Sequence, residues 1–359
     1  MKKIKVTASR NYTVHIGSGI LPELGLLLRA QVPGERVCIV TDDTVQALYG
    51  AQAEESLTQA GFAVCTFAFP HGEQSKCAAT YLKLLNFLAE QHLTRTDAIV
   101  ALGGGVPGDL AGFAAATYLR GIAFAQVPTT LLAAVDSSVG GKTAIDLDAG
   151  KNLAGAFWQP CLVLCDPDTL QPLPEEIFAD GCAEVIKYGV IKNAAFLEYL
   201  DEKRDKVNAL DAETMQTVIY NCCAVKAAVV QQDETETGLR AILNFGHTVG
   251  HGIESAKNFA LLHGECVALG MLAALDIALG RGYISEADLD KCRNLLRAYG
   301  LPEKTGGVSI KQVLEYMKND KKKENGSLRF VLPRPVGAAD VYNDVTQTEL
   351  AHAVETVLE

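Results

Sequence analysis

The amino-acid sequence predicts an α/β domain with a parallel sheet, followed by a mostly α-helical domain. In the first half of the chain, short apolar runs alternate with stretches of helical periodicity, which is typical of a parallel sheet covered by helices. The alternation stops after Pro172-Leu173-Pro174, where long helical stretches rich in Ala, Val and Leu begin. We therefore place a boundary near Pro172, between domains at residues 1–172 and 173–359.

The elements of the first domain can be placed in order. The basic N-terminus leads into an alternating strand pattern, and residues 81–91 have helical periodicity. The other expected strands are short apolar runs at residues 36–41, 62–69, 97–102, 124–128 and 162–166. In the second domain, residues 175 to about 300 are expected to be nearly all helical. One isolated strand at 327–332 and a final helix should follow.

Composition excludes several classes of function. The chain of 359 residues is 48% hydrophobic and 21% charged, as in soluble globular proteins, and no apolar run approaches the roughly 18 uncharged residues of a membrane span. A net charge of −11 argues against nucleic-acid binding, but a locally positive pocket could still bind a small anion. Ten cysteines without a framework spacing indicate reduced thiols and a cytoplasmic protein.

Three of the seven histidines fall in one window and suggest a metal site. His247 and His251 are four residues apart, so they share a helix face, and His263 follows shortly after. Upstream, Glu184 and Lys187 form a charged pair at i, i+3 among apolar neighbours. A metal with an open coordination position accounts for this pattern, although two histidines at helical spacing also occur by chance. Thr248 stands where the H-E-x-x-H motif needs a glutamate, so a zinc peptidase is not expected.

A glycine-rich segment at residues 103–109 follows an expected strand and precedes a helix at 110–116. It matches G-x-G-x-x-G, whose glycines let a phosphate approach the backbone at a helix N-terminus, and Pro107 fits the first helical turn. The acid usually found about 20 residues later is absent, and Asp42 ends an earlier strand instead. We favour a pyrophosphate site in a non-standard nucleotide fold over a mere tight turn.

Two further polar groups are candidates for binding an anion. Residues 140–143 resemble a P-loop, but Val135 replaces its first glycine, so ATP binding is rejected. The lysines at 142 and 151 and the amide at 152 could form an anion cradle or a solvated loop. Lys226, Glu236, Arg240 and Asn244 form the second group. The last three are four apart, which predicts one helical face continuing to His251, either facing a substrate or solvent.

Together these segments closely resemble the 3-dehydroquinate synthase family over nearly the whole chain. The matching motifs are residues 71–76, 101–109, 128–133, 140–143, 151–157, 183–189, 243–251 and 263–265. His71 and Pro107 depart from the more frequent residues of the family pattern, which puts the fine geometry of the cofactor loop in doubt.

The resemblance implies conversion of 3-deoxy-D-arabino-heptulosonate 7-phosphate to 3-dehydroquinate and phosphate, the second step of the shikimate pathway. The implied steps are transient oxidation, phosphate elimination, re-reduction, ring opening and an intramolecular aldol closure. NAD would be the cofactor, Zn2+ or Co2+ the metal, a small anionic sugar phosphate the substrate, and a homodimer the assembly. The first domain would then bind nucleotide, and the helical domain would bind metal and substrate.

The resemblance also implies site residues. The metal ligands would be Glu184, His247 and His263, which moves His251 from the metal to the substrate phosphate. The residues implied at the substrate, including one that reaches into the partner subunit, are Arg120, Asp136, Lys142, Asn152, Lys187, Lys226, Glu236, Arg240, Asn244, His251, Lys321 and Lys322. The residues implied at the cofactor are Asp42, His71, Gly72, Glu73, Gln74, Ser75, Lys76, Gly104, Gly105, Val106, Pro107, Gly108, Asp109, Thr129, Thr130, Lys142, Lys151, Thr169, Leu170, Gln171 and Pro172.

Three other functions remain open from the sequence. A related cyclase could act on sedoheptulose 7-phosphate or glucose 6-phosphate, but these lack the carboxylate that Arg240, Asn244 and His251 together favour. A metal-dependent alcohol dehydrogenase of similar architecture would not need so many cationic residues. A non-catalytic NAD-binding regulator would not need Glu184, His247 and His263 together.

Overall fold

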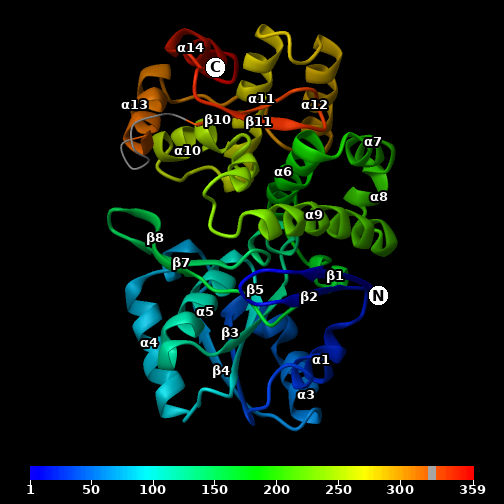
Figure 1. Cartoon of the computed structure of the whole chain (residues 1–359), viewed down its shortest axis with the longest axis vertical. Helices are drawn as coiled ribbons and strands as arrows, with labels where there is room; N and C mark the ends of the chain where they lie inside the picture. The colour runs from blue at the N-terminus through cyan, green and yellow to red at the C-terminus, as the bar shows by residue number, and fades with distance from the viewer. Residues whose placement is uncertain (322–328) are drawn as a thin grey trace. The chain divides into compact units, whose positions relative to one another are not determined.

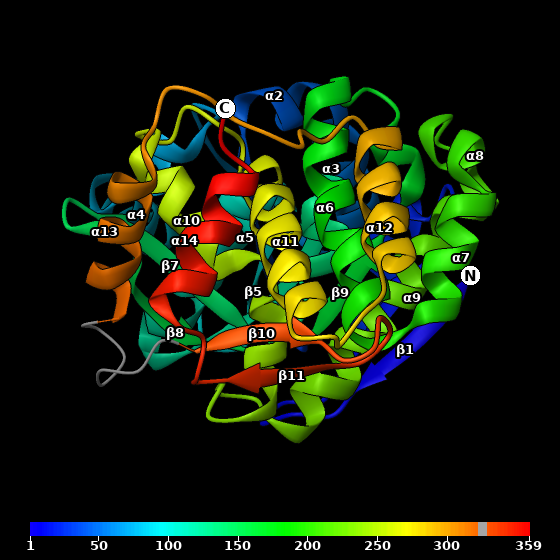
Figure 2. The ribbon, with the colours of Figure 1, turned by 90° about the horizontal axis from the view of Figure 1, so that it is seen from above.

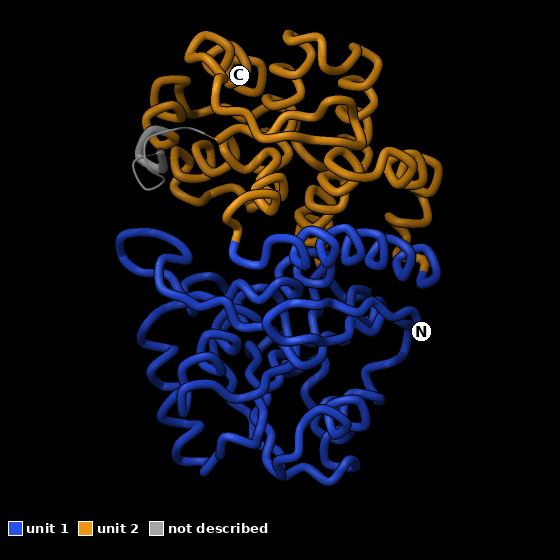
Figure 3. Tube along the Cα trace, in the orientation of Figure 1, with its two compact units in different colours: residues 1–173, 212–235 blue, residues 174–211, 236–359 orange. Residues whose placement is uncertain are grey.

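The computed structural model describes residues 1–321 and 329–359 and divides the chain into two compact units (Figure 3). Unit 1 comprises Met1–Leu173 and Ala212–Thr235, and unit 2 comprises Pro174–Asp211 and Glu236–Glu359. The chain first passes from unit 1 to unit 2 after Leu173, one residue from the boundary that we placed at 172.

One helix lies in a different unit from the one we expected. Residues 212–232 form helix α9 (Ala212–Gln232), which packs in unit 1 against strands β1 (Lys2–Val6) and β2 (Tyr12–Ile16). The Nζ of Lys2 donates to Thr217 Oγ1 at 2.9 Å. An amphipathic sequence shows that a helix has a buried face but does not show which neighbour covers it. The expected boundary therefore could not account for this helix.

Unit 1 contains a seven-stranded sheet in the order β1-β2-β9-β6-β5-β3-β4 (Figure 1). Only β1 runs antiparallel to its neighbour; the remaining pairs are parallel, which confirms the predicted fold class. The five strands expected from apolar runs are β3 (Arg36–Asp42), β4 (Ala63–Phe69), β5 (Ala98–Gly103), β6 (Ala123–Pro128) and β9 (Leu162–Cys165). The helices of unit 1 before α9 are α1 (Leu24–Arg29), α2 (Asp43–Val45), α3 (Ala51–Gln59), α4 (Ala78–Glu90) and α5 (Gly105–Thr117).

The central strands are apolar throughout because helices cover both faces of the sheet. In β3, Val37 and Ile39 belong to one core cluster with residues of α1 and α3. Cys38 and Val40 belong to a second cluster with residues of α4 and α5. This alternation is the two-residue period of a strand, seen here with both faces buried. The carboxyl ends of the parallel strands consequently meet at one edge, where ligands bind in open α/β sheets.

Residues 142–157, which include the lysines and the amide of the expected anion cradle or solvated loop, form a β-hairpin. Strand β7 (Lys142–Leu147) pairs antiparallel with β8 (Gly150–Phe157). A two-residue turn at 148–149 joins them. Sequence reasoning missed the hairpin because we judged the glycines and lysines by their resemblance to a P-loop.

Unit 2 is mostly helical, as predicted. Its helices are α6 (Glu175–Lys192), α7 (Ala194–Glu202), α8 (Arg204–Asn208), α10 (His247–Ala256), α11 (His263–Gly280), α12 (Glu286–Ala298), α13 (Ile310–Lys321) and α14 (Gln347–Thr356). The strand expected to be isolated is β10 (Phe330–Pro333), which pairs antiparallel with β11 (Ala339–Tyr342). That expectation was wrong because the four-residue partner is too short to show a clear pattern.

Helix α11 lies between α12 and α14 and forms the core of unit 2 (Figure 2). It has 18 residues and is apolar enough, by length and composition alone, to cross a membrane. Our expectation concerned uncharged runs, and α11 does not contradict it, because Glu265 and Asp276 lie within the helix. The helix is a core element, since 72% of its residues are buried in the structure.

Glycines let α10 and α11 approach each other closely. A Cβ at Gly270 of α11 would lie 1.8 Å from the carbonyl oxygen of Gly246, and one at Gly250 of α10 would lie 2.8 Å from that of Cys266. Gly246 also has a φ of +81°, which disfavours other residues. The spacing of these two helices thus depends on the absence of side chains at these positions.

We expect Gly270→Ala to lower the free energy of unfolding by about 1–3 kcal/mol or more, because the added methyl would overlap a backbone oxygen. Gly280→Ala is the matched control at the end of the same helix, where an added Cβ has no atom within 4 Å. It should be neutral or stabilise by about 0.5–1 kcal/mol. Urea unfolding of both variants measures the difference, and equal midpoints would contradict the close approach.

Candidate functional site

A buried acid and base on α6 begin the candidate site in unit 2. Glu184 is 0% exposed and Lys187 is 1% exposed, and the Lys187 Nζ contacts Glu184 Oε2. One helical turn separates the two residues, so their side chains meet on the same face. The prediction that this pair is buried together is confirmed.

The first turn of α11 lies against α6 at the same place. The N–H of Gly264 donates to Asp180 Oδ1 at 2.5 Å, and a Cβ at Gly264 would lie 2.0 Å from the backbone oxygen of Asp180. Asp180 and Glu184 are four residues apart on α6, so the turn fixed by Asp180 brings His263 to Glu184. Sequence reasoning did not identify Asp180, although its spacing from Glu184 was a usable signal.

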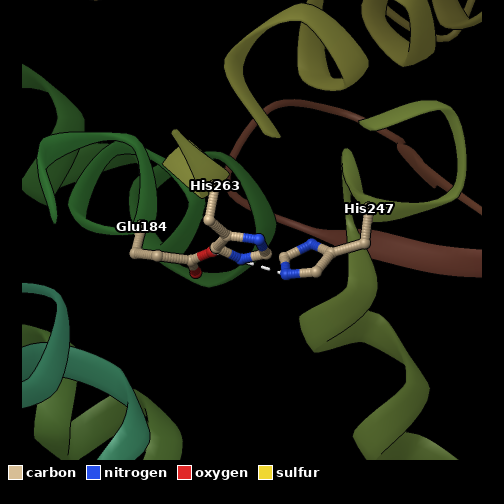
Figure 4. Close-up of side chains that lie close together, drawn as sticks. All are labelled: Glu184, His247 and His263. Atoms are coloured by element: carbon tan, nitrogen blue, oxygen red, sulfur yellow. Dashed lines mark ion pairs between the residues drawn. The ribbon is translucent and has the colours of Figure 1, made fainter. Parts of the chain in front are cut away.

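Helix α10 supplies the second histidine. His247 is its first residue, directly after the left-handed Gly246. Its Nε2 lies 3.4 Å from Glu184 Oε1, and the Nε2 of His263 lies 3.7 Å from the same oxygen (Figure 4). Glu184, His247 and His263 thus each direct a potential ligand atom to a common region, with these atoms within 4.8 Å of one another.

His251 lies beside this group, as its four-residue spacing from His247 predicts. Its ring centroid is 5.3 Å from that of His247 and 5.9 Å from that of His263. His251 and His263 also form a second group of potential ligands with Glu254, a buried residue of α10 that sequence reasoning missed. The three histidines are therefore close together, and geometry alone offers two overlapping sets of ligands.

Burial and charge act oppositely on the two histidines nearest Glu184. Burial lowers the pKa of His247 to about 3, although Glu184 opposes the shift, so this imidazole is neutral and can donate a lone pair. Burial also lowers the pKa of His263, but the nearby carboxylates of Glu184 and Glu254 outweigh it and raise the value to about 10. His263 therefore carries a proton that a bound cation would displace.

The donor set fits a transition metal. Two imidazoles and one carboxylate are the ligands of several catalytic zinc sites, which keep a fourth position for water or substrate. Zn2+ and Co2+ both accept such nitrogen and oxygen ligands, whereas Mg2+ and Ca2+ prefer oxygen alone.

The polar residues expected to share one helical face do not lie on a helix together. Glu236 has a φ of +63°, Arg240 and Asn244 lie in a 3-10 helix at Leu239–Asn244, and α10 begins only after Gly246. The prediction was wrong because Gly238 and Gly246 adopt conformations that end regular helix on both sides. Even so, the Nδ2 of Asn244 donates to Glu236 Oε1 at 2.7 Å, and Arg240 is 1% exposed.

Unit 1 contains a polar pair at the edge where its parallel strands end. Lys226 of α9 donates to Asp136 Oδ1 at 2.6 Å and to the backbone oxygen of Asp136 at 2.8 Å. Asp136 lies in a single turn of π-helix, Ala133–Ser137, shortly after β6. Irregular turns of this kind often occur at functional sites.

The glycine-rich segment has the strand–turn–helix geometry expected of a phosphate site. Gly103 ends β5 with a φ of +150°, and α5 begins at Gly105, which places Pro107 in its first turn. The N–H of Thr129 donates to Gly103 at 2.9 Å, and a Cβ at Gly104 would lie 3.1 Å from Thr130. The structure thus brings together these predicted cofactor residues: Gly104, Gly105, Val106, Pro107, Gly108, Asp109, Thr129 and Thr130.

Lys76 joins the segment at 71–76 to this loop. Its Nζ lies 2.9 Å from Glu73, 3.3 Å from Asp109 and 3.9 Å from Asp146. Burial raises the pKa of Asp109 to about 6, although Lys76 opposes the shift. Asp146 of β7 was missed because it lies outside every motif that we identified.

The remaining predicted residues of unit 1 are distributed over several loops. Asp42 accepts a hydrogen bond from the N–H of Val45 at the end of β3, and His71 is exposed and contacts Asp43 at 2.8 Å. The 3-10 turn after β9 includes Thr169 and Leu170, and Gln171 and Pro172 follow it. A second 3-10 turn, Glu73–Ser75, contains Gln74 and Ser75 and directly follows Gly72. Lys142 begins β7, whereas Lys151 and Asn152 lie near the hairpin turn.

Two predicted residues cannot be placed with their side chains. Lys321 is the last residue of α13, and its side chain lies outside the described part of the chain. Lys322 lies wholly outside the described residues.

Comparison with known proteins agrees with the geometry of the site. Family models described as 3-dehydroquinate synthase N-terminal and C-terminal match residues 66–180 and 181–323. The 3-dehydroquinate synthase of Desulforamulus reducens is 46% identical over 344 residues, which cover 95% of this chain and 96% of that protein.

Two solved structures have the same fold. A 2-deoxy-scyllo-inosose synthase complexed with carbaglucose-6-phosphate, NAD+ and Co2+ has a TM-score of 0.88 at 28% identity, covering 98% of this chain and 99% of that one. The 2-epi-5-epi-valiolone synthase of Streptomyces hygroscopicus, with NAD+ and Zn2+ bound, has a TM-score of 0.89 at 27% identity, covering 99% of each chain. With both family models matched and 46% identity over nearly its full length, this chain belongs to the 3-dehydroquinate synthase family.

Proposed function

We propose that the chain converts 3-deoxy-D-arabino-heptulosonate 7-phosphate to 3-dehydroquinate and phosphate. The observation that carries the proposal is the convergence of Glu184, His247 and His263 in a chain 46% identical to a 3-dehydroquinate synthase. A 2-deoxy-scyllo-inosose synthase and a 2-epi-5-epi-valiolone synthase share the fold at lower identity. The test below therefore includes sedoheptulose 7-phosphate as an alternative substrate.

The cofactors would be NAD+ and Zn2+ or Co2+, as in the two similar cyclases. Glu184, His247 and His263 would hold the metal, and the loop at 104–109 with Asp42, Glu73, Lys76, Thr129 and Thr130 would hold the nucleotide. When bound, NAD+ supplies reversible hydride transfer, and the metal supplies Lewis acidity toward adjacent hydroxyls. The glycines and the N-terminus of α5 suit a pyrophosphate, because backbone N–H groups can reach its oxygens.

The chain's own polar residues would orient the two anionic ends of the substrate. Arg240 and Lys226 would bind the carboxylate, and Lys142, Asn152, Asn244, His251 and a lysine at 321–322 would bind the phosphate. Asp136 and Lys187 would contact ring hydroxyls, with Asp136 held by Lys226 at 2.6 Å. Fixing both ends of one flexible molecule lowers the entropy lost in its rearrangement, so positioning would supply much of the rate. The substrate's own phosphate can accept the proton that leaves the substrate carbon before elimination. No side chain is therefore needed as the base for this step.

A homodimer in the cytoplasm is the proposed form of the enzyme. Leu119 and Arg120 both have positive φ values, and Leu147, Leu153 and Phe157 of the β7–β8 hairpin are 43–44% exposed. A strained turn and exposed apolar side chains are both features that suit a contact with a second copy. Arg120 would reach the partner's substrate from this turn.

Phosphate release tests the function directly. Purified protein with NAD+ and Zn2+ or Co2+ is offered the heptulosonate 7-phosphate and sedoheptulose 7-phosphate in parallel, and free phosphate and NADH are measured. We expect release from the heptulosonate alone and no net NADH, because the hydride returns to the product. Release from the sedoheptulose phosphate alone would assign a different cyclisation, and net NADH would indicate a dehydrogenase.

We expect His247→Ala to reduce metal content to substoichiometric levels and to abolish turnover, because two remaining protein ligands hold Zn2+ poorly. Elemental analysis of the purified variant measures the metal. His352→Ala is the matched control, since His352 is an exposed histidine on α14. Retention of stoichiometric metal in His247→Ala would refute the ligand assignment.

Arg240→Ala should weaken substrate binding far more than NAD+ binding, because the guanidinium would pair with the substrate carboxylate. A loss of roughly 10- to 100-fold for the substrate corresponds to a charged hydrogen bond of about 1.5–3 kcal/mol. Calorimetry with each ligand separates the two effects, and thermal unfolding shows whether loss of this buried side chain disturbs the fold. Equal losses for both ligands would contradict the assignment.

A further inference from the structure

Each histidine of the proposed metal centre has a second ring nitrogen, and the surroundings of that nitrogen differ. For His247, Nδ1 lies 3.1 Å from the backbone oxygen of Phe245. A carbonyl oxygen can only accept, so Nδ1 holds the proton, and Nε2, 3.4 Å from Glu184, keeps its lone pair. A backbone oxygen therefore fixes both the tautomer and the direction of this ring.

For His263, a carboxylate occupies the corresponding position. Its Nε2 lies 3.7 Å from Glu184 Oε1, while Nδ1 lies 3.9 Å from Glu254 Oε2. Glu254 is 6% exposed and lies on α10, seven residues after His247 and three after His251. These spacings place all three residues on one face of α10.

We propose that Glu254 is a positioning residue for the metal centre, which holds Nδ1–H of His263 so that Nε2 points at the metal. The proposal deepens the proposed function and rests on its assignment of Glu184, His247 and His263 as ligands. Histidines that bind metals usually donate their other N–H to a carboxylate, a backbone carbonyl or a water. His247 has the carbonyl, and Glu254 provides the carboxylate for His263.

The orientation of the His263 ring favours this role over direct binding of the metal by Glu254, since its Nε2 faces Glu184 and its Nδ1 faces Glu254. The Nδ1–Oε2 separation is only about 1 Å longer than a charge-assisted hydrogen bond, and such bonds often tighten when a site is filled. Asp180 accepts a hydrogen bond from the N–H of Gly264 and so holds the backbone beside His263. Glu254 could instead be a ligand in the second set, with His251 and His263. His263 would then have to coordinate through Nδ1, with Nε2 left toward Glu184.

Metal affinity of the full-length protein tests the proposal without measuring activity. The protein is stripped of metal, and Zn2+ binding is measured by competition with a chromophoric chelator. The absorption of bound Co2+ reports the coordination geometry. The variants are Glu254→Ala, Glu254→Gln, His247→Ala and Glu265→Ala. Glu265 caps the same first turn of α11, accepting from the N–H of Leu262 at 2.9 Å, so its loss loosens the helix end without removing the contact to the ring.

We expect Glu254→Ala to weaken Zn2+ binding about 10- to 100-fold and to change the Co2+ spectrum. Glu254→Gln, which has nearly the same shape and keeps an acceptor oxygen, should recover part of the affinity, and Glu265→Ala should bind Zn2+ like the unchanged protein. Wild-type affinity and spectrum in Glu254→Ala would overturn the proposal, as would an equal loss in Glu265→Ala.

The remaining outcomes separate this proposal from the proposed function. If His247→Ala loses the metal while Glu254→Ala keeps it, the metal centre stands and the positioning role fails. If Glu254→Ala loses the metal as fully as His247→Ala does, Glu254 is itself a ligand, and the positioning role is overturned. If His247→Ala retains tight stoichiometric Zn2+, the ligand assignment fails, and the positioning role fails with it.

Discussion

Glu184 is a carboxylate with 0% exposure, and several elements of unit 2 supply groups that compensate for its buried charge. An isolated buried charge costs several kcal/mol even after the protein relaxes around it. Lys187 one turn away and the histidines that begin α10 and α11 provide the compensating charge and polar contacts. The close approach of α10 and α11 through Gly246, Gly250 and Gly270 is what allows these groups to reach one acid.

Unit 1 follows a different rule. Its parallel strands are apolar on both faces, so polar side chains gather where the strands end. The glycine-rich turn after β5, Thr129 after β6 and the turn after β9 all lie at this edge. The sheet fixes the position of each loop, and in such folds binding residues are commonly found on loops.

The sequence predicts local features of this chain well and long-range ones poorly. The strands β3, β5 and β6, the helix start around Pro107 and the buried pair Glu184–Lys187 depend on neighbouring residues, and each was predicted. The supposed helical face from Glu236 to His251 failed because a periodic spacing says nothing about glycines that break the helix. The contact of Asp146 with Lys76 could not be predicted, since it depends on segments far apart in the chain being brought together. The contact of Glu254 with His263 could not be predicted either, because it depends on how α10 and α11 pack.

The placement of α9 has a consequence for how this protein can be divided. The chain enters unit 2 after Leu173, returns to unit 1 for Ala212–Thr235 and then leaves it again, so neither unit is a continuous segment. A fragment ending at Leu173 would lack the helix that packs on β1 and β2, and it would also lack Glu234, which holds Ser9 at 2.8 Å and Gln159 at 2.8 Å. A fragment that contains the whole of unit 1 therefore has to be built by joining residue 173 to residue 212 through a linker, since no single cut through the chain yields one.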